Sequence, residues 1–351
     1  APLINESGGF FMRRYEIDTP GSIDGLNLHE RPMPTPGANE VVVRVRANSL
    51  NAHDLMVLNN APMTPGRVGL VPLSDGAGEI AAVGAGVKQW RNGDRVVAIF
   101  RQNWLAGDIP EGADFDLGGG LDGMAAEYVV LSEEGVLRIP DALSFAEAAT
   151  LPCAGVTAWN ALMSAQLQPG ASVLIQGTGG VSLLALQFAK AMGLRVVAIT
   201  SSAEKMALLQ NLGADSVINY REQPDWSGAV REASNGGVDL VVEVGGLATL
   251  PISIGSLRYG GRISIVGLLS GFPQSDGAAL FGAMFARAAT LHPVMVGSRA
   301  DFADMLRAIE INALHPVIDA RRFAFSELPE ALHYFARSGH IGKVVVDYDI
   351  A

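Results

Sequence analysis

The fold of this chain is decided by residues 172–193, which read SVLIQGTGGVSLLALQFAKAMG. A short apolar run ends at Gln176, a glycine-rich turn follows, and a helical pattern of apolar residues comes after the turn. Gly177 and Gly179 allow a tight turn and a close approach of the backbone to a phosphate, and a helix N-terminus offers unpaired N–H groups to an anion. The stretch therefore predicts a dinucleotide-binding loop, with Ser182 in the place of the third glycine of the usual pattern.

Strand and helix patterns continue to alternate after this loop. Apolar runs that polar residues do not interrupt are typical of strands buried on both faces of a sheet. The order predicts a parallel sheet covered by helices on both faces, which is a Rossmann domain. The expected strands are 172–176, 195–200, 216–219, 238–244 and 261–267, and the expected helices are 181–193 and 203–213.

The sequence before this domain is rich in strand patterns instead. Strands are expected at 41–51, 78–87 and 92–100, separated by turns that contain Gly and Pro. A first strand is expected to begin at Met12, so that residues 1–11 form an extension to which we assign no function. Many short strands without a long helical pattern predict a barrel or a sandwich.

Two further segments lie before the glycine-rich loop. Residues 103–123 contain several acidic residues and hardly any basic one, and we interpret them as a solvated surface loop, with a substrate lid as the alternative. Residues 144–163 predict a helix, a turn and a second helix, because Ser144 can cap the first helix and Glu147 follows three residues later.

The end of the chain returns to the strand-rich part in this interpretation. A helix is expected at 301–311, then a segment 315–325, a helix at 327–337 and a last strand at 343–348. The Rossmann domain, residues 155–296, is then an insertion in a second domain. That second domain consists of residues 12–154 and 297–351.

Composition and charge exclude several classes of protein. A chain of 351 residues exceeds the usual size of one hydrophobic core, so two domains are expected. The formal net charge of -11 argues against a nucleic-acid-binding surface. The sequence contains no run of about 20 apolar residues, so no membrane span is predicted. Cys153 is the only cysteine, which excludes an intramolecular disulfide and every zinc site with several cysteines. We expect a cytoplasmic protein, since few cysteines fit a reducing compartment.

The end of the strand 195–200 predicts which dinucleotide binds. In an NAD enzyme an acidic residue at this point binds the ribose hydroxyls. Here Thr200, Ser201 and Ser202 are neutral, and Lys205 follows them. Hydroxyl groups and a lysine suit a 2′-phosphate, which a carboxylate would repel. The sequence therefore predicts NADP(H) as the cofactor.

Several segments together resemble the zinc-independent medium-chain dehydrogenases/reductases, especially the quinone-oxidoreductase-like and zinc-free alcohol dehydrogenase-like members. The Rossmann half contains GTGGVSLLALQFAKAMG, ADSVINYRE, GGVDLVVEVGG and YGGRISIVGLLSG, and the other half contains LNAHDLMVL, PLSDGAGEIAAVG, NGDRV and HIGKVVV. The resemblance runs from about Met12 to Tyr348. It implies an α/β fold in which a Rossmann dinucleotide-binding domain is inserted in a GroES-like, β-rich catalytic domain, with the nicotinamide held in a cleft between the domains.

The resemblance also implies a set of cofactor contacts. Those for the nicotinamide and the pyrophosphate are Thr157, Gly177, Thr178, Gly179, Gly180 and Val181. Those around the adenosine end are Thr200, Ser201, Ser202, Lys205 and Tyr220. Those at later strand ends are Val244, Gly245, Val266, Gly267 and Leu268, and Val294 to Val296 are expected to reach the carboxamide. Lys343 is a further expected cofactor contact.

The same resemblance predicts that no metal is bound. Asn51 stands where the metal-dependent branch has a cysteine, and Leu73-Ser74-Asp75 stand where that branch has Gly-His-Glu. Cys153 lies at a third ligand position without its partners, so we expect it to be a small buried apolar side chain.

Without a metal, a hydrogen-bond donor or a general acid must meet the negative charge that hydride transfer places on a substrate oxygen. Asn51 and His53 are the predicted catalytic residues; the alternative for His53 is a bond to the backbone. Asp54 is a further catalytic candidate whose position favours a helix cap, and the role of Asp75 stays open.

The sequence predicts a zinc-free oxidoreductase that uses NADPH to reduce a quinone, an enal or a related carbonyl compound. The alternatives are a zinc-free alcohol dehydrogenase that uses NADP⁺ and a non-catalytic NADPH-binding protein. The apolar segment 291–298 reads as a strand at the end of the Rossmann domain. An uncovered edge strand can pair with its symmetry mate, so a homodimer is expected.

Overall fold

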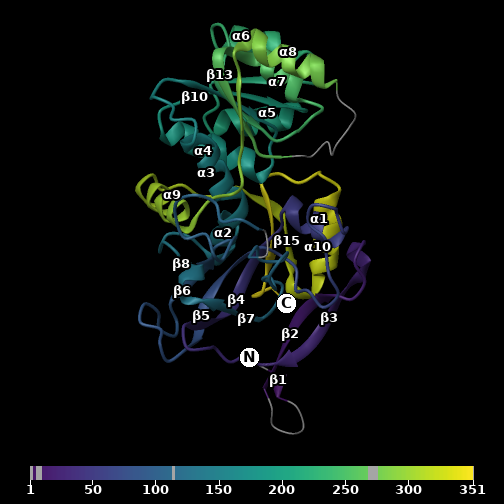
Figure 1. Cartoon of the computed structure of the whole chain (residues 1–351), viewed down its shortest axis with the longest axis vertical. Helices are drawn as coiled ribbons and strands as arrows, with labels where there is room; N and C mark the ends of the chain where they lie inside the picture. The colour runs from purple at the N-terminus through teal and green to yellow at the C-terminus, as the bar shows by residue number, and fades with distance from the viewer. Residues whose placement is uncertain (1–2, 5–9, 113–114, 268–275, 351) are drawn as a thin grey trace. The chain divides into compact units, whose positions relative to one another are not determined.

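The structure, a computed structural model, describes residues 3–4, 10–112, 115–267 and 276–350. The chain divides into two compact units, one made of residues 1–154 and 297–351 and the other of residues 155–296 (Figure 1). We call them the β-rich unit and the Rossmann unit. In Figure 1 the C-terminal helix α10 (Leu328–Ala336) belongs with the strands from the N-terminal part of the chain. The end of the chain thus returns to the unit in which it begins.

Six parallel strands form the sheet of the Rossmann unit, in the order β11-β10-β9-β12-β13-β14. The strand order reverses between β9 and β12, where Leu174 and Val241 pair and are fully buried. This arrangement confirms the predicted fold class, and ligands of such sheets bind at the carboxyl ends of the strands near the reversal. The strands are β9 (Ser172–Gln176), β10 (Arg195–Thr200), β11 (Ser216–Asn219), β12 (Val238–Glu243), β13 (Leu257–Ile265) and β14 (Thr290–Pro293).

The helices of the Rossmann unit are α3 (Val156–Met163), α4 (Gly180–Ala191), α5 (Ala203–Asn211), α6 (Trp226–Ala233), α7 (Leu250–Ser256) and α8 (Gly277–Arg287). α4 is apolar on most sides because it packs on the sheet and on α3, where Trp159 meets Phe188 edge to face at 5.5 Å. The sequence analysis missed α6, α7 and α8. Each contains a glycine in its interior, which weakens a helical pattern.

The last strand of this sheet differs from its prediction. β14 covers Thr290–Pro293 and lies at an edge of the sheet, whereas the sequence analysis expected a strand over 291–298. Beyond Pro293 the backbone leaves the extended conformation, and Val296 has a φ of 52°. The dimer prediction rests on an edge strand at this end of the sheet. β14 is such an edge strand, but it is shorter than the predicted strand.

The β-rich unit contains a seven-stranded sheet in the order β15-β16-β4-β5-β6-β8, with β7 also paired to β4. The C-terminal strand β16 lies between β15 and β4, and its Val345 faces Ser49 in an antiparallel pair. The strands are β4 (Glu40–Ser49), β5 (Asp75–Val83), β6 (Arg95–Ala98), β7 (Tyr128–Ser132), β8 (Val136–Arg138), β15 (Ile318–Ala324) and β16 (Lys343–Asp347). A three-stranded sheet joins β1 (Leu3–Ile4), β2 (Phe10–Ile17) and β3 (Leu26–Pro32).

The helices of this unit include α1 (Ala52–Leu58), α2 (Phe145–Ala149) and α9 (Arg299–Ile311). Ser144 and Glu147 form the predicted capping box at the start of α2. The turn expected after α2 is instead a π-helical segment, Leu151–Gly155, that leads directly into α3. In the described part of the chain, no helix is long and apolar enough to cross a membrane.

The segment 103–123 corrects the expectation of a solvated loop. Asp116 is buried and binds Arg101, with Nε and Oδ1 2.6 Å apart, and Leu117 is only 1% exposed. At Gly118 a Cβ atom would lie 2.7 Å from the backbone of Leu73, so the segment packs closely on the unit. The middle of the segment is therefore part of the core, while Asp114 lies outside the described residues.

Candidate active site

The glycine-rich loop has the geometry that its sequence predicts. Gly177 has a φ of 75°, in the left-handed region that favours glycine, and its N–H donates to Ile199 O at 2.7 Å. A Cβ atom built on Gly177 or on Gly179 would meet no atom within 4 Å, so space is open over the loop. α4 begins at Gly180, and its first N–H groups have no partner inside the helix. These features suit a phosphate group.

Ser182 takes the place of the third glycine without opening a gap. The side chain is buried, and its Oγ donates a hydrogen bond to Gln176 O at 2.6 Å. The bond joins the first turn of α4 to the last residue of β9. The sequence analysis expected a close helix–strand contact here from the small size of serine, and the structure adds the hydrogen bond.

The carboxyl ends of β10 and β11 bring the predicted adenosine contacts together. Ser202 caps α5, and its Oγ accepts from the Lys205 N–H at 3.4 Å. The Tyr220 N–H donates to Thr200 O at 2.9 Å, and the Tyr220 side chain is 39% exposed. Lys205 is partly exposed, and among the described residues its ammonium group has no acidic partner.

The sequence analysis missed Arg221 at the same strand end. Its N–H donates to Asn219 Oδ1 at 3.1 Å in the turn after β11, and its side chain is exposed without an acidic partner among the described residues. A second basic residue directly after Tyr220 was the signal that could have found it. Guanidinium groups bind phosphate through paired hydrogen bonds, so Arg221 joins the candidate contacts.

A buried carboxylate connects the two loops that follow β9 and β12. Glu243, the last residue of β12, is fully buried. Its oxygens accept from Gln176 Nε2 at 2.9 Å, Gly245 N at 2.8 Å, Gly246 N at 3.0 Å, Thr249 Oγ1 at 2.6 Å and Ser253 Oγ. Gln176 Oε1 in turn accepts from the Val244 N–H at 3.1 Å. The residue before the glycine-rich loop is thus tied to the loop that contains Val244 and Gly245.

Close backbone packing fixes the other predicted strand-end residues. A Cβ atom on Gly245 would lie 2.2 Å from Thr249 Oγ1, and one on Gly267 would lie 2.4 Å from Val244 O. The remaining predicted contacts are Thr157 on α3, Val266 after β13, and Val294 and Val296 after β14. All of them belong to the Rossmann unit, and Leu268 lies outside the described residues.

In the β-rich unit Asn51 lies in a buried polar cluster, while the other predicted catalytic residues, His53 and Asp54, are not members of it. Asn51 is 6% exposed, and its Nδ2 donates to Ser74 Oγ at 3.3 Å. Ser74 Oγ donates to Asp75 Oδ1 at 2.8 Å. Lys343 Nζ donates to Asn51 Oδ1 at 2.5 Å and to Leu50 O at 2.6 Å. We call Asn51, Ser74, Asp75 and Lys343 the polar cluster.

The N-cap of α1 is Asn51, and Asp54, which the sequence analysis favoured as the cap, completes the capping box from inside the helix. Its Oδ2 accepts from the Asn51 N–H at 2.7 Å, and its Oδ1 accepts from the Ser74 N–H at 3.1 Å. The side chain is fully buried. Because both oxygens hold backbone N–H groups, Asp54 positions the segments that carry Asn51 and Ser74.

His53 lies beside the cluster with an unpaired ring nitrogen. Its imidazole packs edge to face on Phe100 at 5.1 Å, and its side chain is 17% exposed. Nδ1 is buried and has no hydrogen-bond partner in the described part of the chain; Asp54 Oδ1 lies 3.9 Å away. The backbone bond that the sequence analysis gave as an alternative is therefore not made by Nδ1.

Burial shifts the pKa of two groups around the cluster. Desolvation and, to a smaller extent, the Asp54 charge raise the pKa of Asp75 to about 6, against the opposing effects of Lys343 and of the hydrogen bonds of Asn51 and Ser74. Desolvation, with the nearby Asp75 charge, raises the pKa of the Cys153 thiol well above its usual value. The Cys153 N–H donates to Asp75 Oδ2 at 3.3 Å. Cys153 therefore contributes a backbone donor and a neutral thiol.

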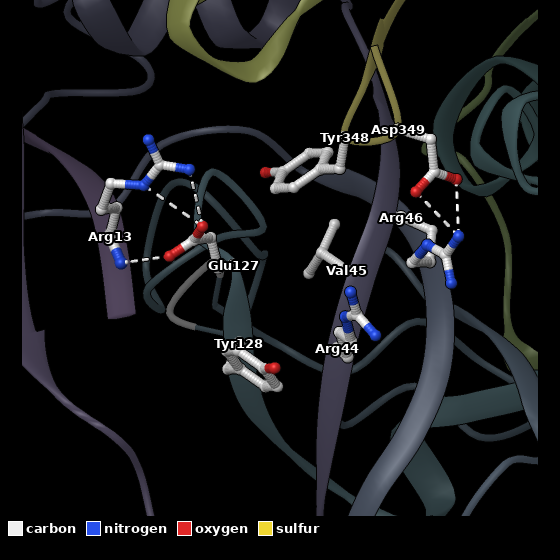
Figure 2. A pocket seen from close by; sticks show the side chains of 8 residues that line it. All are labelled: Arg13, Arg44, Val45, Arg46, Glu127, Tyr128, Tyr348 and Asp349. Atoms are coloured by element: carbon white, nitrogen blue, oxygen red, sulfur yellow. Dashed lines mark hydrogen bonds and ion pairs between the residues drawn. The ribbon is translucent and has the colours of Figure 1, made fainter. Parts of the chain in front are cut away.

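A pocket in the β-rich unit contains none of the predicted residues. Three arginines and two acids are among the residues that line it, and Figure 2 shows two of the arginines bonded to the acids. Arg13 binds Glu127 at 2.8 Å, and Arg46 binds Asp349 at 2.6 Å. Both acids of the pocket are paired with an arginine, so we interpret the pocket as a structural feature and not as a binding site.

Comparisons with known proteins match segments of both units. The model of the alcohol dehydrogenase GroES-like domain matches residues 37–141, and that of the zinc-binding dehydrogenase domain matches residues 180–310. A zinc-type alcohol dehydrogenase-like protein of Schizosaccharomyces pombe is 41% identical over 350 residues, which cover 96% of this chain and 99% of the relative.

Two solved structures share the fold along the chain. The crystal structure of an NAD-dependent alcohol dehydrogenase matches with a TM-score of 0.85 and 33% identity, over 96% of this chain and 99% of that chain. The 2-octenoyl-CoA carboxylase reductase CinF, in complex with NADP and 2-octenoyl-CoA, matches with a TM-score of 0.84 and 25% identity, over 96% of this chain and 87% of that chain. The fold, the glycine-rich loop and these relatives together show that the chain belongs to the medium-chain dehydrogenase/reductase family and is an NAD(P)H-dependent oxidoreductase.

Proposed function

We propose that this protein reduces a quinone, an enal or a related carbonyl compound with NADPH and without zinc. The observation that carries the proposal is the polar cluster, in which hydrogen-bond donors occupy the positions where metal-dependent relatives have ligands. NADPH, when bound, supplies the hydride. The residues of this chain have to hold the dinucleotide and stabilise the oxygen on which negative charge develops.

The donor set does not fit a zinc ion. Tetrahedral zinc needs thiolate, imidazole or carboxylate ligands. Of these the polar cluster offers one, the Asp75 carboxylate, beside the Asn51 amide, the Ser74 hydroxyl and the Lys343 ammonium. Among the described residues, one group of three possible ligands was found, Glu16 with Asp18 and His29, and Arg14 and Arg31 already bind Glu16.

The substrate oxygen needs a donor, and two side chains of the β-rich unit can provide one. Asn51 has a second N–H beyond the one that Ser74 accepts, since its further contact with Ser49 O is long at 3.5 Å. His53 has a partly exposed ring, and a histidine side chain can act as a general acid. We propose Asn51 as the oxyanion-stabilising donor and His53 as the proton donor.

The preference for NADPH follows from the end of β10 and β11. Thr200 and the serines after it carry no negative charge. Lys205 and Arg221 offer positive charges that no described acid neutralises. A charge-assisted hydrogen bond contributes roughly 1.5–3 kcal/mol, which corresponds to about 10- to 150-fold in affinity.

Turnover measurements test this function. We expect the purified protein to consume NADPH with at least one member of a panel of quinones, enals and aldehydes, at a kcat/KM at least about tenfold above that with NADH. A chelator should leave the rate unchanged. Lys205→Ala should remove much of the preference for NADPH while leaving the NADH rate nearly the same, because its ammonium group interacts only with the 2′-phosphate in this proposal.

Three results would contradict the proposal. One tightly bound zinc per chain in elemental analysis would overturn the metal-free site. Equal rates or tighter binding with NADH would overturn the assignment of the strand end. NADPH binding without turnover of any panel member, nor of alcohols with NADP⁺, would indicate a non-catalytic NADPH-binding protein.

We also propose that the protein forms a homodimer through the Rossmann unit. β14 is an edge strand, and α8 exposes Phe281 at 61% and Phe285 at 70%. An uncovered edge and large exposed apolar side chains favour association with a second copy. Light scattering at micromolar concentration should give the molar mass of two chains; a monomer there would remove this proposal.

A further inference from the structure

Lys343 is a buried lysine whose ammonium group is held inside the β-rich unit. It is the first residue of β16 and is 3% exposed. Nζ donates to Leu50 O at 2.6 Å and to Asn51 Oδ1 at 2.5 Å. An ammonium group has three donors and no acceptor, so any oxygen that it contacts has to accept.

This property fixes the orientation of the Asn51 amide. Because Oδ1 accepts from Lys343, Nδ2 points the other way, toward Ser74 Oγ at 3.3 Å. A flipped amide would bring its own N–H groups against the ammonium group, and both groups would then be donors. Ser74 Oγ already donates to Asp75 at 2.8 Å, so its lone pair is the group that accepts from Asn51. Both ends of the polar cluster thus impose the same amide orientation.

The bond to a cation also changes the amide as a donor. A carbonyl oxygen that accepts from a charged donor withdraws electron density from the amide, which strengthens the hydrogen bonds that its N–H groups donate. This effect is stronger where water is excluded, and Asn51 is 6% exposed. The Asn51 N–H groups are therefore both directed and strengthened by Lys343.

We propose that Lys343 is a positioning residue for the reaction, which acts through Asn51 by fixing and polarising its amide so that Nδ2 can stabilise the substrate oxygen. This inference rests on the proposed function, in which Asn51 provides that donor. It gives Lys343 a task different from the cofactor contact that the sequence comparison implies. The two tasks make different predictions for the Lys343→Met variant, which keeps an unbranched side chain one atom shorter and removes its charge.

A double-mutant cycle with Asn51→Ala tests the proposal. Lys343→Met should lower kcat about tenfold, a part of the 100-fold or larger loss that removal of an oxyanion donor causes. The dissociation constant for NADPH should stay within about twofold. In the Asn51→Ala background, the same Lys343→Met change should lower kcat by less than about twofold, because the amide through which it acts is gone. Lys343→Arg retains the charge and should retain more of the kcat than Lys343→Met.

Two outcomes of the cycle would overturn the proposal. A tenfold or larger loss of NADPH affinity in Lys343→Met would show that the ammonium group contacts the cofactor. An equal loss of kcat in both backgrounds would show that Lys343 does not act through Asn51. The melting temperature of each variant identifies any that fail to fold, and Lys343→Arg then serves as the variant compared.

A second measurement does not depend on turnover. Lys343 and Asn51 both lower the pKa of Asp75, against the burial and the Asp54 charge that raise it. With Asp75 observed by carboxyl ¹³C NMR, Lys343→Met and Asn51→Ala should each raise its pKa above the wild-type value. An unchanged pKa in both variants would show that the cluster is not coupled, and would overturn the positioning role. If the wild type turned over no substrate while this coupling was present, the proposed function would fail and the link between Lys343 and Asn51 would stand.

Discussion

Asp75 and Glu243 are both fully buried acids at a strand end, one in each unit, yet their surroundings differ. Glu243 accepts from five protein donors, two of them backbone N–H groups. Asp75 accepts from Ser74 Oγ and Cys153 N, and the Asp54 charge opposes its ionisation. A carboxylate that is surrounded by donors organises the backbone around it. One with few donors and a neighbouring like charge keeps a proton more easily.

The difference matches the tasks that we propose for the two units. The donors of Glu243 come from the ends of β9 and β12 and from α7, which flank the reversal of the strand order. Rigid loops suit the binding of a dinucleotide, since a preformed site loses less entropy when the ligand binds. Asp75 instead ends a chain of hydrogen bonds that begins at Lys343. That arrangement suits a site in which charge changes during a reaction.

Removal of the Glu243 carboxylate should give the largest effect on stability. In Glu243→Ala the N–H groups of Gly245 and Gly246 and the Gln176 amide lose their acceptor. Each buried donor left without a partner costs about 1–3 kcal/mol. For these three donors we expect the free energy of unfolding to fall by roughly 3–9 kcal/mol. Urea unfolding followed by fluorescence measures this change.

Glu243→Gln is the matched control for this prediction. It retains the size of the side chain and one acceptor oxygen, but its amide nitrogen faces donors. The loss should be smaller than in Glu243→Ala, and the affinity for NADPH should still fall, because both cofactor loops depend on this group. If Glu243→Ala had the same free energy of unfolding as the wild type, the hydrogen bonds that Glu243 accepts would have no structural role.

The sequence predicted the local parts of this comparison and missed the distant ones. The glycine-rich loop, the helix after it and the cap at Ser144 are encoded within a few residues, so propensity and spacing were sufficient to predict them. Glu243 gave one signal, an acid at the end of an apolar strand. Its role depends on Gln176 and on residues of α7, which only the parallel pairing of β9 and β12 brings together.

The polar cluster is a second case in which the sequence did not predict a contact between residues far apart in the chain. Lys343 and Asn51 lie 292 positions apart and meet because β16 pairs with β4. From the sequence alone, a lysine in a cofactor-binding fold was assigned to the cofactor. The strand lengths also needed the structure, because tertiary packing decides where 41–51 and 291–298 stop being extended. Arg221 was missed because a basic residue in a turn is usually a solvated one.

The smaller stability effect concerns the ionisation of Asp75 and depends on pH. Burial raises its pKa in the folded protein to about 6, above the value near 3.9 of an exposed aspartate. The folded state then binds the proton more tightly than the unfolded state. The contribution of Asp75 to stability is therefore greatest below about pH 4, declines as the pH rises to about 6, and stays lost above that. Two pKa units correspond to about 2–3 kcal/mol.

The Asp75→Asn variant cannot ionise at this position, so relative to the wild type its free energy of unfolding should gain about 2–3 kcal/mol between pH 4.5 and 7.5. Urea unfolding at four pH values in this range measures the difference, in which the titration of all other groups largely cancels. The exposed Asp141 provides the control, since Asp141→Asn should give a curve parallel to that of the wild type. A parallel curve for Asp75→Asn would show that Asp75 ionises normally, and the contrast with Glu243 would then lie in the hydrogen bonds alone.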